Sequence, residues 1–83
     1  MLEKTYVGVS LTVNRRGDVR PRTIFWYDPE GEIRKYRVDR LKHVCRAAST
    51  KVGGCGMRYT VVVDGRETFL FEEDGRWFVE GRA

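Results

Sequence analysis

The sequence predicts an all-β protein, a small antiparallel meander of about six strands that forms an SH3-like or similar barrel. Three features predict this class. Apolar and polar residues alternate along several short stretches, turn residues separate those stretches, and two Asp-Gly pairs lie between apolar runs. Asp-Gly is typical of the two-residue type I′ hairpin turn, in which both central residues need a positive φ. At 83 residues, the chain is expected to form one β domain over residues 1–83.

The two Asp-Gly pairs, Asp64-Gly65 and Asp74-Gly75, divide residues 57–80 into three strands and set their register. Successive side chains of a strand point to opposite faces, so the register also decides which residues share a face. One face carries an apolar set that we expect to form the core: Met57, Tyr59, Val61, Val63, Leu70, Trp77 and Val79.

The opposite face of this ribbon carries Phe69, Phe71 and Phe78 among polar residues. A sheet with one solvated face should be polar there, so we expect these rings to be covered. The candidates for the cover are the N-terminal half of the same chain, a second subunit and a ligand. Closure by the same chain, as a barrel or sandwich, is the favoured interpretation.

The N-terminal half repeats the pattern of strands and turns. Residues 3–13 alternate between apolar and polar side chains and predict a half-buried strand, which the turn-forming residues 14–18 end. A second strand follows and closes with the aromatic run 23–27. Pro21 near its beginning suits a strand start or a sheet edge.

Residues 28–31, Asp-Pro-Glu-Gly, have the composition of a type I turn and lead into a third strand over residues 32–38. The next segment, 39–48, is ambiguous, because its apolar residues fit both a helical spacing and a strand alternation. We favour a strand, bent near Asp39 and Arg40, because no helix cap or stop signal is present and the surroundings are rich in strands. A single helical turn is the alternative.

The chain is basic, and its positive charge is concentrated in the middle. The formal net charge is +4, and residues 15–51 hold eleven of the 16 Lys and Arg residues but five of the 12 Asp and Glu residues. Twelve of the 16 basic residues are arginine, which suits bidentate contacts with phosphate and stacking on bases. Surface ion pairs or genome base composition would explain the same richness without such a partner.

The sequence carries no recognisable signal for a membrane or for export. No apolar run approaches the ~20 residues of a membrane-spanning helix, and the N-terminus lacks a signal-peptide core. We therefore expect a cytoplasmic protein with no membrane partner. Cys45 and Cys55 are then expected to be free thiols.

The residues do not predict an enzyme. His43 is the one histidine, and neither Ser49 nor Thr50 has a recognisable partner to make it a nucleophile. His43, Cys45 and Cys55 are of metal-ligating types, but the paired spacing of a structural zinc site is absent. We expect no catalytic site, no metal and no cofactor.

Nucleic-acid binding is the function that the sequence best supports. The aromatic run 25–27 lies among basic residues, and consecutive strand residues point to both faces, so at least one ring must point outward. Small β-barrels bind single strands by placing a basic groove beside rings on which bases stack. No RNP-type consensus and no zinc finger is present. The candidate binding residues are Arg20, Arg22, Phe25, Tyr27, Arg34, Lys35, Arg37, Lys51 and Arg58.

The glycine-rich segment 48–56 is a candidate anion-binding loop. Its successive amide groups can form a nest around an anion, with Lys51, Gly53, Gly54 and Gly56 as the candidate residues. A P-loop is not predicted, because Lys51 precedes the glycines and a strand follows them. The alternative is a flexible link into the next strand.

The competing prediction is a protein-interaction or structural module. An apolar second sheet face, exposed strand edges and small size favour self-association, most simply as a homodimer.

The runs RAASTKVGGCGMRYT and FLFEEDGRWFVE together resemble a pattern of short bacterial proteins. In these proteins a similar Arg-Ala-Ala-Ser-x-Lys-x-Gly-Gly-x-Gly-x-Arg-Tyr-Thr run precedes an Arg-Trp-Phe-Val-Glu ending. The resemblance covers about the last 40 residues, and no activity comes with it. It implies that Cys55 occupies a variable position and that the following residues belong to a shared pattern: Arg46, Ser49, Lys51, Gly53, Gly54, Gly56, Arg58 and Trp77.

Overall fold

The computed structural model describes residues 2–47 and 56–82 of the chain. Its strands are β1 (Leu2–Val13), β2 (Val19–Tyr27), β3 (Ile33–Arg37), β4 (Arg40–Ala47), β5 (Gly56–Val63), β6 (Arg66–Glu73) and β7 (Arg76–Arg82). They form one antiparallel sheet in the order β3-β2-β1-β7-β6-β5-β4. The all-β prediction is confirmed, and none of these residues belongs to a helix that could cross a membrane.

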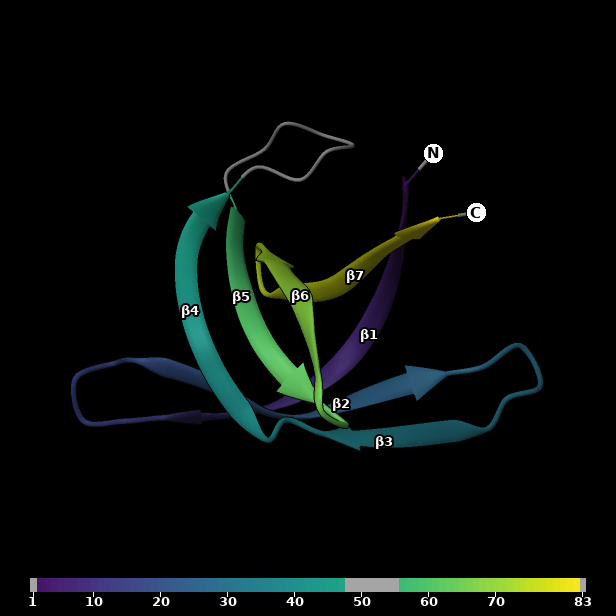
Figure 1. The fold of residues 1–83 in the computed structure, drawn as a ribbon, viewed down its shortest axis with the longest axis horizontal. Coiled ribbons are helices and arrows are strands. Elements are labelled where there is room, and N and C mark those ends of the chain that lie inside the picture. The colour runs from purple at the N-terminus through teal and green to yellow at the C-terminus, as the bar shows by residue number, and fades with distance from the viewer. Residues whose placement is uncertain (1, 48–55, 83) are drawn as a thin grey trace.

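The sheet curls into a half-barrel, which is compatible with the small barrel predicted from the sequence. In Figure 1, β2 and β3 lie along the bottom and the strands β4 to β7 arch above them. Strand β1 joins these two parts, because its residues 2–7 pair with β7 whereas its residues 8–13 pair with β2.

The two ends of the sheet are linked by the short segment Val38-Asp39. The Val38 amide donates to the Arg22 carbonyl of β2 at 2.9 Å, and the Asp39 amide donates to the Val62 carbonyl of β5 at 2.9 Å. The bend therefore falls close to the predicted position. Residues 40–47 form a strand, as favoured from the sequence, with a register shift between Leu41 and His43.

The C-terminal hairpins have the predicted turns and register. Asp64 and Gly65 have φ values of 51° and 75°, and the second pair, Asp74 and Gly75, has 52° and 80°. Positive φ at both central residues is the type I′ geometry, which matches the right-handed twist of the flanking strands. Val63 lies opposite Arg66 and Glu73 opposite Arg76.

The two hairpin loops of the N-terminal half share one design, in which a side-chain oxygen organises the turn. Oδ1 of Asn14 accepts hydrogen bonds from the amides of Arg16 and Asp18. Asp28 Oδ1 accepts in the same way from the amides of Glu30 and Glu32. In each loop a glycine at positive φ closes the turn, as such side-chain caps commonly allow.

One face of the curled sheet, called here the inner face, carries the hydrophobic core. The buried cluster consists of Val7, Ile24, Tyr59, Val61, Leu70 and Trp77. Met57, Val63 and Val79 pack against it, so all seven residues of the predicted core face lie in or beside this core. Pro21 is fully buried in β2, next to a register shift in the pairing of β1 with β2.

The opposite, outer face buries two of its three phenylalanines within the same chain. Phe78 is 0% exposed and Phe71 8%, and their rings stack with centroids 5.3 Å apart. The Tyr6 ring meets Phe78 edge-on, and Lys4 Nζ lies 4.4 Å from the centroid of the Phe78 ring while it pairs with Glu73 at 3.0 Å. The expected cover for these rings is thus supplied in part by strand β1.

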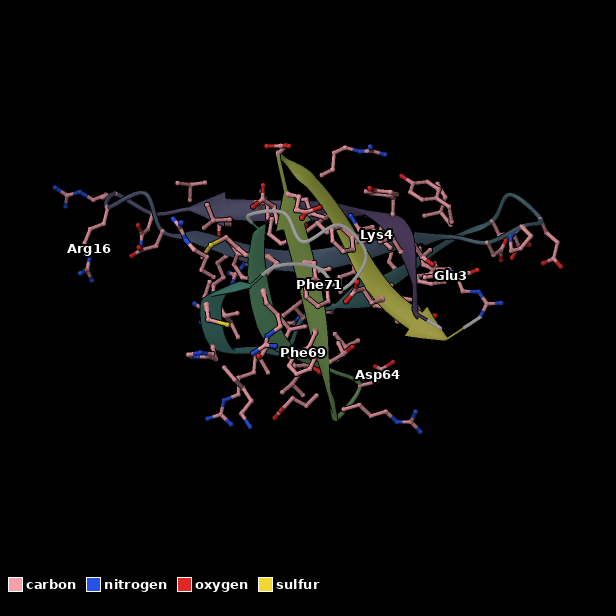
Figure 2. All side chains as sticks on the ribbon, turned by 90° about the horizontal axis from the view of Figure 1, so that it is seen from above. Glu3, Lys4, Arg16, Asp64, Phe69 and Phe71 are labelled. Carbon is pink, nitrogen blue, oxygen red and sulfur yellow. The ribbon has the colours of Figure 1, made fainter. Side chains whose placement is uncertain are left out.

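Phe69 is the exception and remains 45% exposed. In Figure 2, Phe69 and Phe71 both project from β6, with Phe69 nearer the turn at Asp64. The guanidinium of Arg58 lies 4.6 Å from the centroid of the Phe69 ring.

Alanine substitutions of Phe78 and Phe69 form a matched pair that tests this division of the outer face. Phe78→Ala should lower the free energy of unfolding by about 3–5 kcal/mol, because it opens a cavity beneath Tyr6 and Phe71. Phe69→Ala should cost about 1 kcal/mol or less, since its ring is half in water. Urea unfolding followed by circular dichroism measures both, and Phe78→Leu supplies the graded value if the alanine variant unfolds. Equal costs for the two alanine variants would contradict the assigned burial.

The phenol of Tyr59 is the titrating group that the core perturbs. Its ring packs against Trp77 with centroids 4.9 Å apart. Burial raises the pKa of Tyr59 above its ordinary value of 10.0, and the carboxylate of Glu72 raises the pKa further.

A raised pKa in the folded state makes stability depend on alkaline pH. The unfolded phenol ionises first, so the contribution of Tyr59 is present below pH ~10 and is lost as the pH rises through the folded pKa. Glu72→Gln should lower that pKa but leave it above 10.0, because burial is the larger cause. The Cζ chemical shift of Tyr59 against pH measures this, with Glu67→Gln as the control. A Tyr59 that titrates at or below its ordinary value would contradict the assignment.

Candidate nucleic-acid interface

The β2–β3 hairpin brings together aromatic and basic residues that the sequence places in separate strands. Its ladder sets Thr23 opposite Arg37, Phe25 opposite Lys35 and Tyr27 opposite Ile33. Directly opposed residues share a face, and alternate residues of one strand do as well. These six residues therefore lie on one side of the hairpin, the outer side, and are called here the hairpin face.

The intervening residues of the same hairpin point inward. Ile24 is buried in the core, and Trp26 and Tyr36 pack against it. The aromatic run 25–27 is thus divided between the two faces, as strand alternation requires. Trp26 stabilises the core, whereas Phe25 and Tyr27 belong to the surface.

Arg34 is separated from the other candidate residues by this alternation. It lies opposite Trp26, on the inner side of the hairpin, and its Nε is 3.7 Å from Oδ2 of Asp28. The role that the structure shows for Arg34 is an ion pair at the β2–β3 turn. Its charge does not belong to the hairpin face.

Among the apolar side chains of the hairpin face, exposure is greatest near the tip of the hairpin. Tyr27 is 58% exposed and Ile33 54%, while Phe25 is half-buried. Lys35 and Arg37 are exposed and, among the described residues, neither makes an ion pair. The face therefore offers two rings and two unpaired cations to a ligand.

Gly8 of β1 makes room for these two rings. It lies opposite Phe25, and a Cβ added at Gly8 would be 3.3 Å from Tyr27 Oη and 3.4 Å from Phe25 Cβ. The sequence alone shows nothing special at Gly8, because its neighbours are apolar strand residues. Gly8 is recognised as part of the site only from its pairing with Phe25. In the same way, Thr23 and Ile33 are assigned to the site only from their pairing with Arg37 and Tyr27.

The remaining candidate residues are placed in three ways. Arg20 and Arg22 lie in β2 beside the register shift and are exposed. Arg58 lies in β5, which β1, β7 and β6 separate from β2 in the sheet, and it contacts Phe69. Of the predicted anion-binding loop, Lys51, Gly53 and Gly54 lie outside the described residues, and Gly56 is the buried first residue of β5.

The hairpin face combines aromatic rings with cations. Its six residues include no carboxylate, imidazole or thiol, and the rings and cations are those used to stack and neutralise. His43 and Cys45 lie in β4, and Cys55 lies outside the described residues. Among the residues described, no three His, Cys, Asp or Glu side chains come close enough to hold a metal ion.

Compared with known proteins, the chain matches no family model, no curated protein and no solved structure. A functional proposal must therefore rest on the residues of this chain and their geometry.

Substitution of Gly8 tests the packing of the rings on β1. Gly8→Ala should displace the hydroxyl end of Tyr27 by a few tenths of an ångström without loss of the fold, because the φ of Gly8 is one that other residues adopt. Gly8→Val should displace both rings further. Nuclear Overhauser contacts between residue 8 and Tyr27 measure the change, with Ser10→Ala on the same face as the control. Unchanged contacts in Gly8→Val would show that the ring does not lie over β1.

Proposed function

We propose that the protein binds single-stranded nucleic acid on the hairpin face of β2 and β3. The observation that carries the proposal is the register of this hairpin, which places Phe25 beside Lys35 and Thr23 beside Arg37 on one face. Bases stack on exposed rings, and the phosphates of the strand lie against neighbouring cations.

The exposure of the rings favours single strands as the ligand. Each base that stacks on an aromatic side chain contributes about 1–3 kcal/mol, and a base is free to stack in this way only where it is unpaired. Tyr27 presents 58% of its surface, and Phe25 lies next to it on the same strand face. A double helix would present its phosphates but not the faces of its bases.

The charge distribution supports a polyanionic ligand. The net charge is +4, and residues 15–51, which include the whole hairpin, carry a formal charge of +6 while the rest of the chain carries −2. Asp28, the acidic residue at the base of the β2–β3 turn, is engaged by two backbone amides and by Arg34. Its charge therefore does little to oppose an anion on the hairpin face.

Self-association through an apolar sheet face is the competing proposal, and it has less support from the geometry. Phe71 and Phe78, two of the three rings that suggested such a face, are buried in the single chain. Phe69 stays exposed with the Arg58 guanidinium over its ring, and Tyr6 is 43% exposed on the same face. Two partly exposed rings are a small surface for a stable dimer. At the tip of the hairpin face, Tyr27 and Ile33 are each more exposed than Phe69.

Titration of a fluorescent single-stranded DNA or RNA oligonucleotide at low and moderate salt tests the proposal. Phe25→Ala and Tyr27→Ala should each weaken binding by about 5–100-fold, which corresponds to the loss of one stacked base. Lys35→Ala should weaken binding and reduce the slope of log affinity against log salt by ~0.7, because one phosphate contact is lost.

Arg34→Ala is the matched control, since it removes the same charge from the adjacent residue but from the inner side of the hairpin. It should change affinity much less than Lys35→Ala. A duplex of the same length should bind more weakly than the single strand. No binding of the single strand by the unaltered protein at low salt, or equal effects of Arg34→Ala and Lys35→Ala, would refute the proposal.

A further inference from the structure

A polar hollow lies at the end of the hairpin face that is farthest from the turn. It measures about 230 Å³ and is lined by Arg22, Thr23, Arg37, Val38 and Asp39. The Thr23–Arg37 pair is the last one in the β2–β3 ladder. The hollow is therefore continuous with the surface that carries Phe25 and Lys35.

A bulge in β2 positions Arg22 at this hollow. Thr23 pairs with Ser10 of β1 and Pro21 pairs with Leu11, so Arg22 is an extra residue without a partner across the ladder. Bulges of this kind redirect a side chain and are common beside binding sites. The Arg22 carbonyl accepts a hydrogen bond from the Val38 amide at 2.9 Å, which holds the bulge against the segment that lines the hollow.

The charges at the hollow favour an anion. Arg22 and Arg37 are both exposed. Within the described residues, neither of them makes an ion pair with Asp39 or with any other carboxylate. Asp39 is the acidic residue of the lining, so two cations face one carboxylate. Arg22 also lines a second hollow of about 290 Å³, in which Arg20 and Asp18 are the other charged residues of the lining.

We infer that the Arg22–Thr23–Arg37 hollow binds a phosphate group, and that it is the backbone subsite of the proposed nucleic-acid surface. This inference rests on the proposed function. Arginine pairs bidentately with phosphate, and the Thr23 hydroxyl supplies a further donor. The Thr23–Arg37 pair lies two residues from the Phe25–Lys35 pair, or about 7 Å along the strand, so one ligand can reach both.

The subsite also defines the path that the bound nucleic-acid strand takes over the protein surface. Bases stack on Tyr27 and Phe25, and the phosphate backbone then passes Arg37 and Arg22 towards Arg20. The ligand therefore follows β2 from the tip of the β2–β3 hairpin towards the turn of the β1–β2 hairpin. In Figure 1 this is the path along the bottom of the half-barrel.

Inorganic phosphate alone is the first probe. Added at low ionic strength to the full chain labelled with ¹⁵N, it should cause saturable shifts of the Arg22 and Arg37 Nε–H signals and of the Thr23 amide. Asp39→Asn should strengthen phosphate binding about threefold or more, because it removes the opposing charge at the site. Shifts that grow linearly without saturation, or an unchanged affinity in Asp39→Asn, would overturn the subsite.

The oligonucleotide is the second probe. Arg22→Ala and Arg37→Ala should each weaken its binding about tenfold and reduce the salt slope by ~0.7. Arg16→Ala is the control, since Arg16 is exposed in the β1–β2 loop and does not line the hollow. Lysine at position 22 or 37 should restore the salt slope but only part of the affinity, because lysine does not pair bidentately.

The two probes separate failure of the subsite from failure of the proposed function. If the oligonucleotide binds but Arg22→Ala and Arg37→Ala keep the original affinity and salt slope, the subsite is wrong and the proposed function stands. If phosphate binds saturably but no oligonucleotide does, the subsite stands and the proposed function is wrong. Absence of both kinds of binding overturns both.

Discussion

The pairing of strand β1 with two different partners is the constraint on which the rest of the structure depends. Residues 2–7 complete the C-terminal meander through β7, and residues 8–13 hold the β2–β3 hairpin through β2. The second half of β1 is therefore the strand through which the β2–β3 hairpin is hydrogen-bonded to the rest of the sheet. The change takes place between Val7, which is buried in the core, and Gly8, which lies beneath the rings of Phe25 and Tyr27. One short stretch of backbone thus links the packing of the core to the surface proposed to bind a ligand.

The outer face of the sheet shows how a chain of this size accommodates apolar residues on both sides of a strand. Strand alternation places Phe71 and Phe78 on the side away from the inner core. There the two rings stack, the Tyr6 ring meets Phe78 edge-on and the Lys4 ammonium lies over the Phe78 ring. Lys4 keeps its charge paired with Glu73, which limits the cost of placing an amine over a ring in a half-buried site. The rings that stabilise the outer face lie on β6 and β7, whereas the hairpin face lies on β2 and β3 at one end of the sheet. The residues proposed to bind a ligand are therefore separate from the residues that stabilise the outer face.

Turn residues and strand alternation were enough to predict the register and faces of the C-terminal strands, but not those of β2. Asp64-Gly65 and Asp74-Gly75 specify turns that admit one register, so the faces of β5, β6 and β7 follow from simple alternation. In β2 the same alternation is interrupted, because the bulge at Arg22 adds a residue that no sequence pattern marks. In β3 the alternation is regular and by itself sets Arg34 on the face opposite to Lys35 and Arg37. Which of these two faces points to the core is decided by the packing of Ile24, Trp26 and Tyr36.

The sequence by itself determined the class of fold, the turns and the gathering of basic and aromatic residues in the middle of the chain, since these depend on φ preferences and on residues near each other. Only the tertiary structure decided that β1 pairs with β7, that Gly8 lies under Tyr27, and that Arg22 and Arg37 border one hollow. These contacts join residues far apart in the chain or on either side of a bulge. Their free energy comes from side-chain packing across strands, and no short stretch of sequence specifies which distant strand will be the partner.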